Sequence, residues 1–186
     1  MRGAYVTSAT RMRTANSLRH ERKLTAAWYS GTTGLPPFDD LVKKALAHAY
    51  VPQNQRLMVA VSLMLLCEIH PDDIRRWLSE LFIDSYDWSV LPNVYGMCQL
   101  ADKQTSPIKL PISASSYLLQ ISHYERGQWA DVWDGLFWRF VDKHQSLLKH
   151  DPQLRVFVSR LERLDADHRR IIGYRADDFL NRYTLL

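Results

Sequence analysis

The sequence predicts an all-α protein that folds as one multi-helix domain. Three observations predict this. Apolar residues recur at helical spacing along most of the chain, and stretches that alternate apolar with polar residues are nearly absent. The composition, 46% hydrophobic and 24% charged, is that of a globular protein. Because 186 residues suffice to bury one core and give no reason to expect two, we expect a single domain over residues 1–186.

The first two helices follow from the distribution of apolar residues. One begins with Asp39 or Asp40 as its N-cap and buries a face that includes Leu41 and Ala45. The stretch 55–70 is apolar nearly all round, which indicates a helix buried among others rather than one on the surface. It is therefore expected to be the central helix.

The rest of the chain continues the helical pattern with one interruption. Pro71 breaks the central helix, Asp72 caps the next one, and helical spacing extends that helix to about residue 83. The stretch 87–111 contains three prolines and little periodicity, which is typical of a long ordered loop. Further helices are expected near the following ranges, the last one broken around Leu164 to Asp167: 114–123, 129–149 and 153–180.

Composition and charge exclude several classes of protein. Two cysteines, Cys67 and Cys98, are too few for a disulfide scaffold or a four-thiolate metal site, and no secretory signal precedes them. The longest apolar run, 57–67, is too short to span a membrane. We therefore expect a cytoplasmic protein. The spacing of the seven histidines also makes a zinc site improbable.

The first 23 residues are basic, with six Lys or Arg against one acid, Glu21, and the net charge is +4. Such a segment attracts phosphate, although a solvated basic end explains it equally well. A start that is poor in acids and rich in Ser, Thr and Arg also imitates a mitochondrial transit peptide. The charge pattern alone does not choose between these interpretations.

The stretch HYERGQWADVWDGLFWRFVDKHQ, residues 123–145, is unusually rich in aromatic residues. Large aromatic side chains bury much area and stack on flat partners, so the cluster is a core, the wall of a ligand site or what is left of an older site. Its aromatic members are Tyr124, Trp129, Trp133, Phe137, Trp138 and Phe140.

Several motifs in order carry a resemblance to a known family. TGLPPFDDLVKKAL is followed by AYVPQNQRLMVAVSLMLL, then by PNVYGMCQLAD, and the tail contains LFWRFVDKHQSLLKHDPQLRVFVSRLERLD. From about Tyr5 to Phe179 the chain resembles the C-terminal helical FAD-binding domain of photolyases and cryptochromes. It is most similar to the prokaryotic iron-sulfur branch, the bacterial (6-4) photolyase-like proteins. The family's N-terminal α/β antenna domain has no counterpart in this sequence.

The resemblance implies FAD as the cofactor and the family's light-driven repair of DNA photoproducts or blue-light sensing as the activity, since the flavin carries the chemistry. It implies that the turn Ser30 to Gly34 meets the pyrophosphate and that Trp77 belongs to an electron-transfer route. On residue type alone, Trp77 on an apolar stripe is more often core. The cofactor-binding residues implied are Ser30, Thr32, Thr33, Gln55, Arg56, Asn93, Gly96 and Met97.

The sequence departs from the family at its catalytic positions. The paired histidines that protonate the lesion fall on Pro52 and Gln53, neither of which is an acid near neutral pH. The acid near the flavin N5 falls on Val90, and the lesion-side tyrosine falls on Pro111. The resemblance therefore implies no catalytic residues and impaired repair.

The iron-sulfur ligands of the branch are also replaced. Thiolates hold such clusters, so we expect no iron-sulfur cluster and no other metal. We expect Trp129 and Trp133, one helical turn apart, to fill the volume that the cluster occupies in the family. The four cluster positions fall on Pro37, Glu125, Gln128 and Asp131.

Three interpretations of function stay open at this point. The chain is a flavin-binding domain with DNA at the mouth of its pocket, or a degenerate cofactor-free helical module that binds nucleic acid or a protein partner. In the third interpretation it is one half of a split photolyase that pairs with a separate antenna-domain protein, and an exposed apolar patch would support this.

Overall fold

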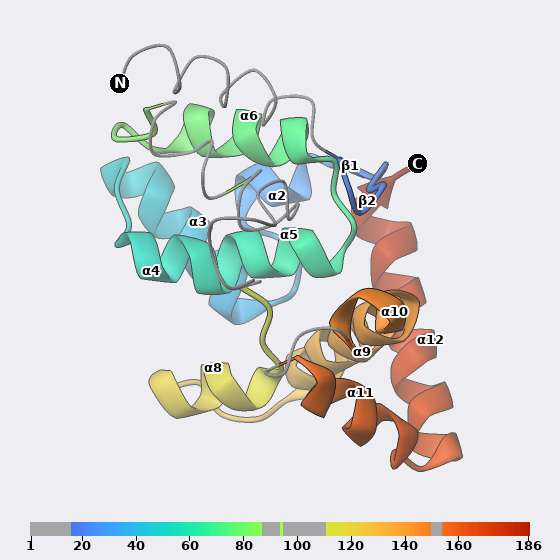
Figure 1. Cartoon of the computed structure of the whole chain (residues 1–186). Coiled ribbons are helices and arrows are strands. Elements are labelled where there is room, and N and C mark those ends of the chain that lie inside the picture. The colour runs from blue at the N-terminus through green and yellow to red at the C-terminus, as the bar shows by residue number, and fades with distance from the viewer. Residues whose placement is uncertain (1–15, 87–93, 95–110, 150–153) are drawn as a thin grey trace.

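The computed structural model describes residues 16–86, 94, 111–149 and 154–186, and it is predominantly helical, as the sequence predicts (Figure 1). The described helices are α2 (Ala27–Ser30), α3 (Pro36–His48), α4 (Gln53–Gln55), η1 (Arg56–Val61), α5 (Ser62–Leu66), α6 (Pro71–Leu81), α8 (Ser115–Ile121), α9 (Gln128–Lys143), α10 (Gln145–Leu148), α11 (Arg155–Glu162) and α12 (Ala166–Tyr183). Two short strands, β1 (Lys23–Leu24) and β2 (Thr184–Leu185), pair antiparallel.

The central helix is built from α4, η1 and α5 in direct succession, and every residue of α5 is buried. Its middle part, η1, is a π-helix of six residues that begins at Arg56. Such wide turns are rare and occur often at functional sites. The helix ends at Leu66, earlier than the expected His70, because Glu68 adopts a left-handed φ of 58° and the residue before Pro71 must be extended.

The helices α3 and α6 both begin earlier than expected, so the expected N-caps, Asp39 or Asp40 for α3 and Asp72 for α6, are wrong. Both helices begin at a proline, Pro36 and Pro71, whose missing N–H is not needed in the first turn. Asp39 therefore lies inside α3 rather than at its cap. The cap of α6 is His70, whose Nδ1 accepts a hydrogen bond from the backbone N–H of Asp72 at 3.2 Å.

The C-terminal helices follow the sequence pattern closely. The expected helix over 129–149 is α9 followed by α10, with His144 between them. The expected helix over 153–180 is broken as predicted, because α11 ends at Glu162 and α12 begins at Ala166. Asp165 caps α12 by accepting a hydrogen bond from the N–H of His168 at 3.1 Å.

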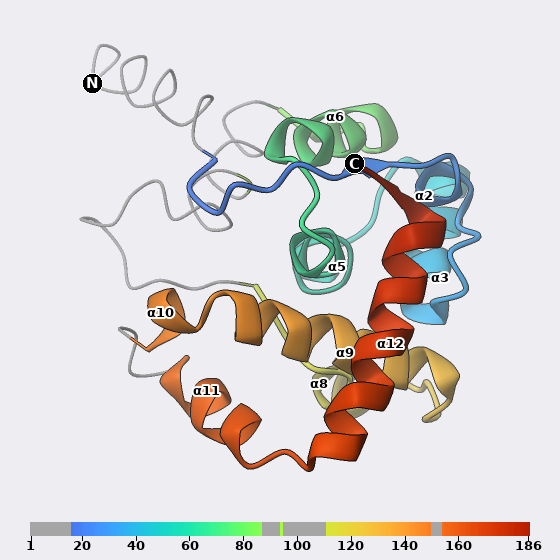
Figure 2. The same cartoon turned by 90° about the vertical axis from the view of Figure 1, so that its right-hand side faces the viewer.

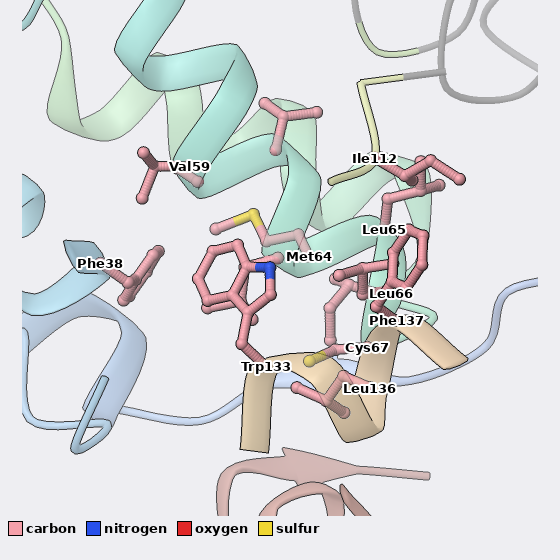
Figure 3. Packing of buried hydrophobic residues seen from close by; sticks show 14 of the residues in the cluster. Phe38, Val59, Met64, Leu65, Leu66, Cys67, Ile112, Trp133, Leu136 and Phe137 are labelled. Carbon is pink, nitrogen blue, oxygen red and sulfur yellow. The ribbon is translucent and has the colours of Figure 1, made fainter. Parts of the chain in front are cut away.

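The helices α9 and α12 cross closely and join the C-terminal part to the centre (Figure 2). Gly135 makes this approach possible, because a Cβ at that position would overlap the backbone carbonyl of Ile172 and lie 3.2 Å from the Cβ of Ala176. Figure 3 shows Trp133 of α9 directed at Met64 of α5 inside the core. Trp133, Phe137 and Phe140 are fully buried, so the aromatic stretch is mainly core.

The two ends of the described chain meet beside α2. The strand β1 pairs with β2, and the carbonyl of Tyr183 accepts hydrogen bonds from the Trp28 indole at 2.6 Å and the Thr25 hydroxyl at 2.9 Å. This contact holds the N-terminal segment against α12 over a long sequence separation. Within the part of the chain that the structure describes, no helix has the length and apolar character needed to cross a membrane.

Candidate functional site

An arginine–carboxylate pair stands where η1 begins. The guanidinium of Arg56 donates two hydrogen bonds to the carboxylate of Asp84, at 2.7 and 2.6 Å, and a third from Nε to the carbonyl of Val51 at 2.7 Å. Arg56 is buried, whereas the Asp84 side chain is 40% exposed. The hydrogen bonds from Arg56 lower the pKa of Asp84, so the carboxylate is charged and the pair is electrically neutral.

Aromatic side chains surround the Arg56–Asp84 pair. The Arg56 guanidinium lies 4.6 Å from the ring centre of Phe82 and 5.6 Å from that of Tyr50. These contacts are cation–π interactions, which hold the planar group in one orientation. Tyr50 is 53% exposed, so the pair and one aromatic ring reach the surface together.

A row of aromatic rings leads from this pair into the core. Phe82 meets Trp77 edge to face at 5.7 Å, and Trp77 stacks on Phe38 at 5.8 Å. Phe38 in turn meets Trp28 at 5.0 Å. The Trp77 indole is fully buried and donates to the carbonyl of Trp28 at 3.0 Å. The structure thus places Trp77 one ring away from the Arg56–Asp84 pair.

The turn expected to hold a pyrophosphate is filled by the protein's own carboxylate. Asp39 accepts hydrogen bonds from the N–H of Thr33 at 2.9 Å, the hydroxyl of Thr33 at 2.7 Å and the N–H of Gly34 at 2.8 Å. Both Thr33 and Asp39 are buried. The hydroxyls of Ser30 and Thr32 are exposed but hydrogen-bonded to each other at 2.8 Å. These donors therefore stabilise the turn, and a ligand contact at Ser30, Thr32 and Thr33 stays a prediction.

The structure also separates the expected cofactor residues into two groups. The turn Ser30 to Gly34 lies just before the first residue of α3. Arg56 donates a hydrogen bond to Val51, which lies just after the last residue of α3. A helix of 13 residues holds these two ends about 18 Å apart. Gln55 lies with the second group, while Asn93, Gly96 and Met97 lie outside the described residues.

Gln55 contributes its exposed side chain to a small cavity of about 160 Å³ between α3, η1 and α8. Pro37, Lys44 and Tyr124 line the same cavity. The Tyr124 hydroxyl donates to the Asp40 carboxylate at 2.8 Å, and this closes one side. Burial and the hydrogen bond to Asp40 raise the pKa of Tyr124, so the phenol stays protonated.

Three of the four positions expected to match the family's catalytic groups lie in the described residues. Pro52 precedes α4 and Gln53 is its first residue, both exposed. Pro111 is buried at the start of the segment before α8, and Val90 lies outside the described residues. Pro52 and Pro111 carry no side-chain proton donor, and the amide of Gln53 is no acid, so none of the three supplies a proton near neutral pH.

The tryptophans expected to fill the cluster volume both point into the protein. Trp129 is 8% exposed and Trp133 is fully buried. Their indole N–H groups donate to the carbonyl of Glu125 at 3.0 Å and of Ser113 at 2.8 Å. Of the expected cluster positions, Pro37 is buried in α3, Glu125 and Gln128 are exposed, and Asp131 binds the Arg175 guanidinium.

Sequence reasoning missed a second buried polar group near β1. The carboxylate of Glu68 accepts hydrogen bonds from Arg139 and Lys143, both at 2.8 Å, beside His20 and His144. Burial alone raises the pKa of Glu68, but the Lys143 hydrogen bond and the nearby cations hold it below its usual value. No short motif signals this group, because its members come from three distant segments.

Comparison with known proteins places these features in a lineage. No protein-family model matches the sequence. The chain is 28% identical over 192 aligned residues to the (6-4) photolyase of Agrobacterium fabrum, and the match covers 98% of this chain and 38% of that protein. The chain thus spans well under half the length of that photolyase. This similarity supports a photolyase-like lineage and agrees with the resemblance seen in the sequence.

A second relative is a protein of Acanthamoeba polyphaga mimivirus whose name is Uncharacterized protein R855. It is 33% identical over 107 residues, which are 57% of this chain and 85% of that protein. At this identity, and with most of the viral protein aligned, the two share one fold and one descent. The chain belongs to the same family as mimivirus R855, within a lineage that is similar to part of a (6-4) photolyase.

Proposed function

We propose that this chain is the helical, flavin-holding part of a photolyase-type protein, with the isoalloxazine ring at the Arg56–Asp84 pair. The observation that carries the proposal is the pair itself. A buried guanidinium, a half-exposed carboxylate and a rare π-helix meet at one point. Phe82, which contacts Arg56, lies 5.7 Å ring to ring from Trp77, the expected member of an electron-transfer route. The similarity to a photolyase along 98% of the chain supports it.

The described residues at this end of α3 fit an isoalloxazine ring. The ring is flat, apolar on its faces and lined on one edge by carbonyl oxygens and an N–H group. Tyr50 offers an exposed aromatic face, Gln55 offers an amide that both donates and accepts, and the exposed part of Asp84 accepts. The pair is neutral, so an uncharged ring is not repelled.

The turn at the other end of α3 does not fit the pyrophosphate. The backbone N–H groups of Thr33 and Gly34 already donate to Asp39, so they are not free to bind a pyrophosphate. The proposal therefore assigns the flavin contacts of this chain to Gln55, Arg56, Asp84 and Tyr50, and it removes Ser30, Thr32 and Thr33 from the set.

The flavin, when bound, supplies light-driven electron transfer. The chain's own residues would orient the ring through the Arg56–Asp84 pair and would offer Trp77, held by its hydrogen bond to Trp28, as a buried donor. With Pro52 and Gln53 at the catalytic positions, no described group there can protonate a lesion. We therefore propose photoreduction or light sensing as the function, with repair lost.

Flavin retention tests the proposal. The purified chain is incubated with excess FAD, desalted and examined by absorption spectroscopy. We expect bands near ~450 nm at a stoichiometry approaching one FAD per chain. A colourless chain would refute flavin binding by this chain.

Photoreduction of the loaded protein tests the role of Trp77. Under blue light without oxygen, the rate normalised to bound flavin should fall at least about tenfold in Trp77→Phe, since phenylalanine is far harder to oxidise. Trp138→Phe, which removes a half-buried tryptophan on α9, is the matched control and should leave the rate unchanged. Equal rates in all three proteins would exclude Trp77 as the donor.

Two observations favour a chain without a cofactor, and with it a second function, a helical module that binds nucleic acid or a protein partner. The anion-binding donors of the turn are satisfied internally, and the charge of Arg56 is neutralised by Asp84. A colourless chain that shifts a duplex oligonucleotide in a gel at low salt, with an affinity that falls steeply with salt, would support this function.

A further inference from the structure

We propose that a second cleft, between α9 and α12, is a binding site for a nucleoside monophosphate. The cleft has a volume of about 390 Å³ and is open on one side. This volume lies in the range of small-ligand pockets. The site is independent of the proposed flavin contacts, because it lies at the N-terminal end of α3 and the Arg56–Asp84 pair lies at the other end.

Three structural elements form the walls of the α9–α12 cleft. One wall is a face of α12 that extends over more than two turns, from Tyr174 to Tyr183. The opposite wall consists of the first turns of α9 and the residues Thr33 to Leu35. Because Asp39 and the α9–α12 crossing at Gly135 fix these elements, the cleft is preformed rather than assembled by a loop.

The apolar part of the cleft is aromatic. Phe179 and Tyr183 form one side with ring centres 4.8 Å apart, and Trp129 lies opposite on α9. Tyr174 lines the cleft although its side chain is among the most exposed aromatics, at 77%. A flat ring in the cleft would contact Tyr174 and Tyr183 at its open side, and an exposed tyrosine is the residue type that gains most from such a partner.

The polar part of the cleft is cationic. Among its described lining residues, Arg175 and Arg182 are cationic and Asp178 is the single acid. Arg175 is held by Asp131, which it shares with Arg126. Arg182 bonds Asp178 at 3.0 Å one helical turn away, and its side chain is 68% exposed. Such exposed pairs contribute little, so Arg182 can exchange Asp178 for a phosphate, which guanidinium groups bind in bidentate fashion.

The two parts together define the ligand class. An aromatic slot beside an exchangeable arginine recognises a planar base that carries one anionic group a few ångströms away. A nucleoside monophosphate has this shape and charge. An uncharged nucleoside or inorganic phosphate alone would satisfy only half of the cleft.

NMR spectroscopy of the full chain with adenosine 5′-monophosphate tests the proposal. The indole N–H of Trp129, assigned through Trp129→Phe, is a probe at the cleft. We expect a saturable shift of this signal with adenosine 5′-monophosphate, and affinities about tenfold weaker for adenosine and for inorganic phosphate. An unshifted Trp129 signal, or equal binding of inorganic phosphate, would overturn the assignment.

Two arginines on α12 provide a matched pair of variants. Arg182 and Arg170 each pair with an aspartate of the same helix, Asp178 and Asp167, but only Arg182 lines the cleft. We expect Arg182→Gln to weaken adenosine 5′-monophosphate about 5- to 10-fold and Arg170→Gln to leave it unchanged. Equal effects of the two variants would overturn the proposal.

Two further measurements distinguish a nucleoside monophosphate from a nucleic-acid end, and the α9–α12 cleft from the proposed flavin site. If a 5′-phosphorylated tetranucleotide binds at least about tenfold more tightly than the mononucleotide, the ligand of the cleft is the end of a nucleic acid rather than a free nucleotide. That result would overturn the proposal. Because FAD itself contains adenosine 5′-monophosphate, the flavin is supplied here as riboflavin, whose retention should be equal in Arg182→Gln and the unchanged chain. Flavin retention reports on the Arg56–Asp84 end of α3. A chain that retains no flavin therefore leaves the result for the α9–α12 cleft unaffected.

Discussion

Among the described residues, Asp84 is the carboxylate that balances the charge of the buried Arg56, and this makes the pair a sensitive point for stability. If Asp84→Asn removes the charge of the partner, the buried guanidinium keeps its desolvation cost without the compensating ion pair. Because Asp84 is 40% exposed, we expect a moderate loss of about 1–3 kcal/mol in the free energy of unfolding, measured with urea. Asp178→Asn, which breaks an exposed pair, should change it by less than about 0.5 kcal/mol.

His20 makes the fold sensitive to acid. It is fully buried, and neither ring nitrogen has a hydrogen-bond partner among the described residues. Burial, followed by the nearby His144 and Lys143, lowers the pKa of His20 from 6.5 to about 3. The pKa of His144 is also lowered, chiefly by burial. The unfolded chain therefore binds protons below pH 6.5 that the folded chain does not, so stability falls as the pH falls.

We expect about 2 kcal/mol of stability to be lost to His20 between pH 7.5 and pH 5, measured by urea unfolding at both values. The lowered pKa of Glu68 acts only below its unfolded value of 4.5, so it does not contribute in this window. His20→Leu should reduce the loss, leaving the smaller part that belongs to His144. An unchanged pH dependence in that variant would show that His20 is not the group responsible.

At the scale of single residues, the sequence indicated candidate positions but not the partners of their side chains. Arg56 lies in the central helix as expected, but its partner Asp84 is 28 residues away and no local pattern connects them. The partner of Thr33 was unpredictable for a similar reason. Whether backbone donors face a ligand or an internal carboxylate such as Asp39 depends on where the next helix begins.

At the scale of elements, the crossing of α9 and α12 depends on one glycine. A Cβ at Gly135 would lie 3.0 Å from the carbonyl carbon of Ile172 and closer still to its oxygen, and backbone atoms cannot rotate away. We expect Gly135→Ala to lower the free energy of unfolding by about 1–3 kcal/mol in urea.

Gly173 on α12 is the matched control for this substitution. A Cβ there meets nothing within 4 Å, and alanine favours a helix over glycine. Gly173→Ala should therefore stabilise the protein by about 0.5–1 kcal/mol under the same conditions. If Gly135→Ala and Gly173→Ala destabilised the protein by a similar amount, the effect would come from placing alanine in these helices and not from the close crossing of α9 and α12.

The helices themselves were predictable because the 3.6-residue period survives in the sequence wherever one face is buried, as in α6 and α11. Their ends were less predictable. Pro36 and Pro71 shift two starts, and the left-handed Glu68 ends the central helix early. Over only six residues, the spacing of side chains in the π-helix η1 differs too little from that of an α-helix to be recognised in the sequence.

At the scale of the whole molecule, α3 acts as a rigid spacer between two different ends. At one end a filled turn borders the α9–α12 cleft, and at the other the Arg56–Asp84 pair stands before a row of aromatic rings. The aromatic stretch of α9 fills the core between them. The chain keeps a helical fold within a lineage that is similar to part of a (6-4) photolyase.

FAD retention in three proteins tests most directly where a flavin contacts this chain. Gln55→Ala and Ser30→Ala each change one exposed side chain, at opposite ends of α3, so both variants should fold. We predict that the unchanged chain and Ser30→Ala retain FAD after desalting and that Gln55→Ala retains at least about fivefold less. Loss of FAD in Ser30→Ala but not in Gln55→Ala, or a colourless unchanged chain, would contradict the proposed flavin site.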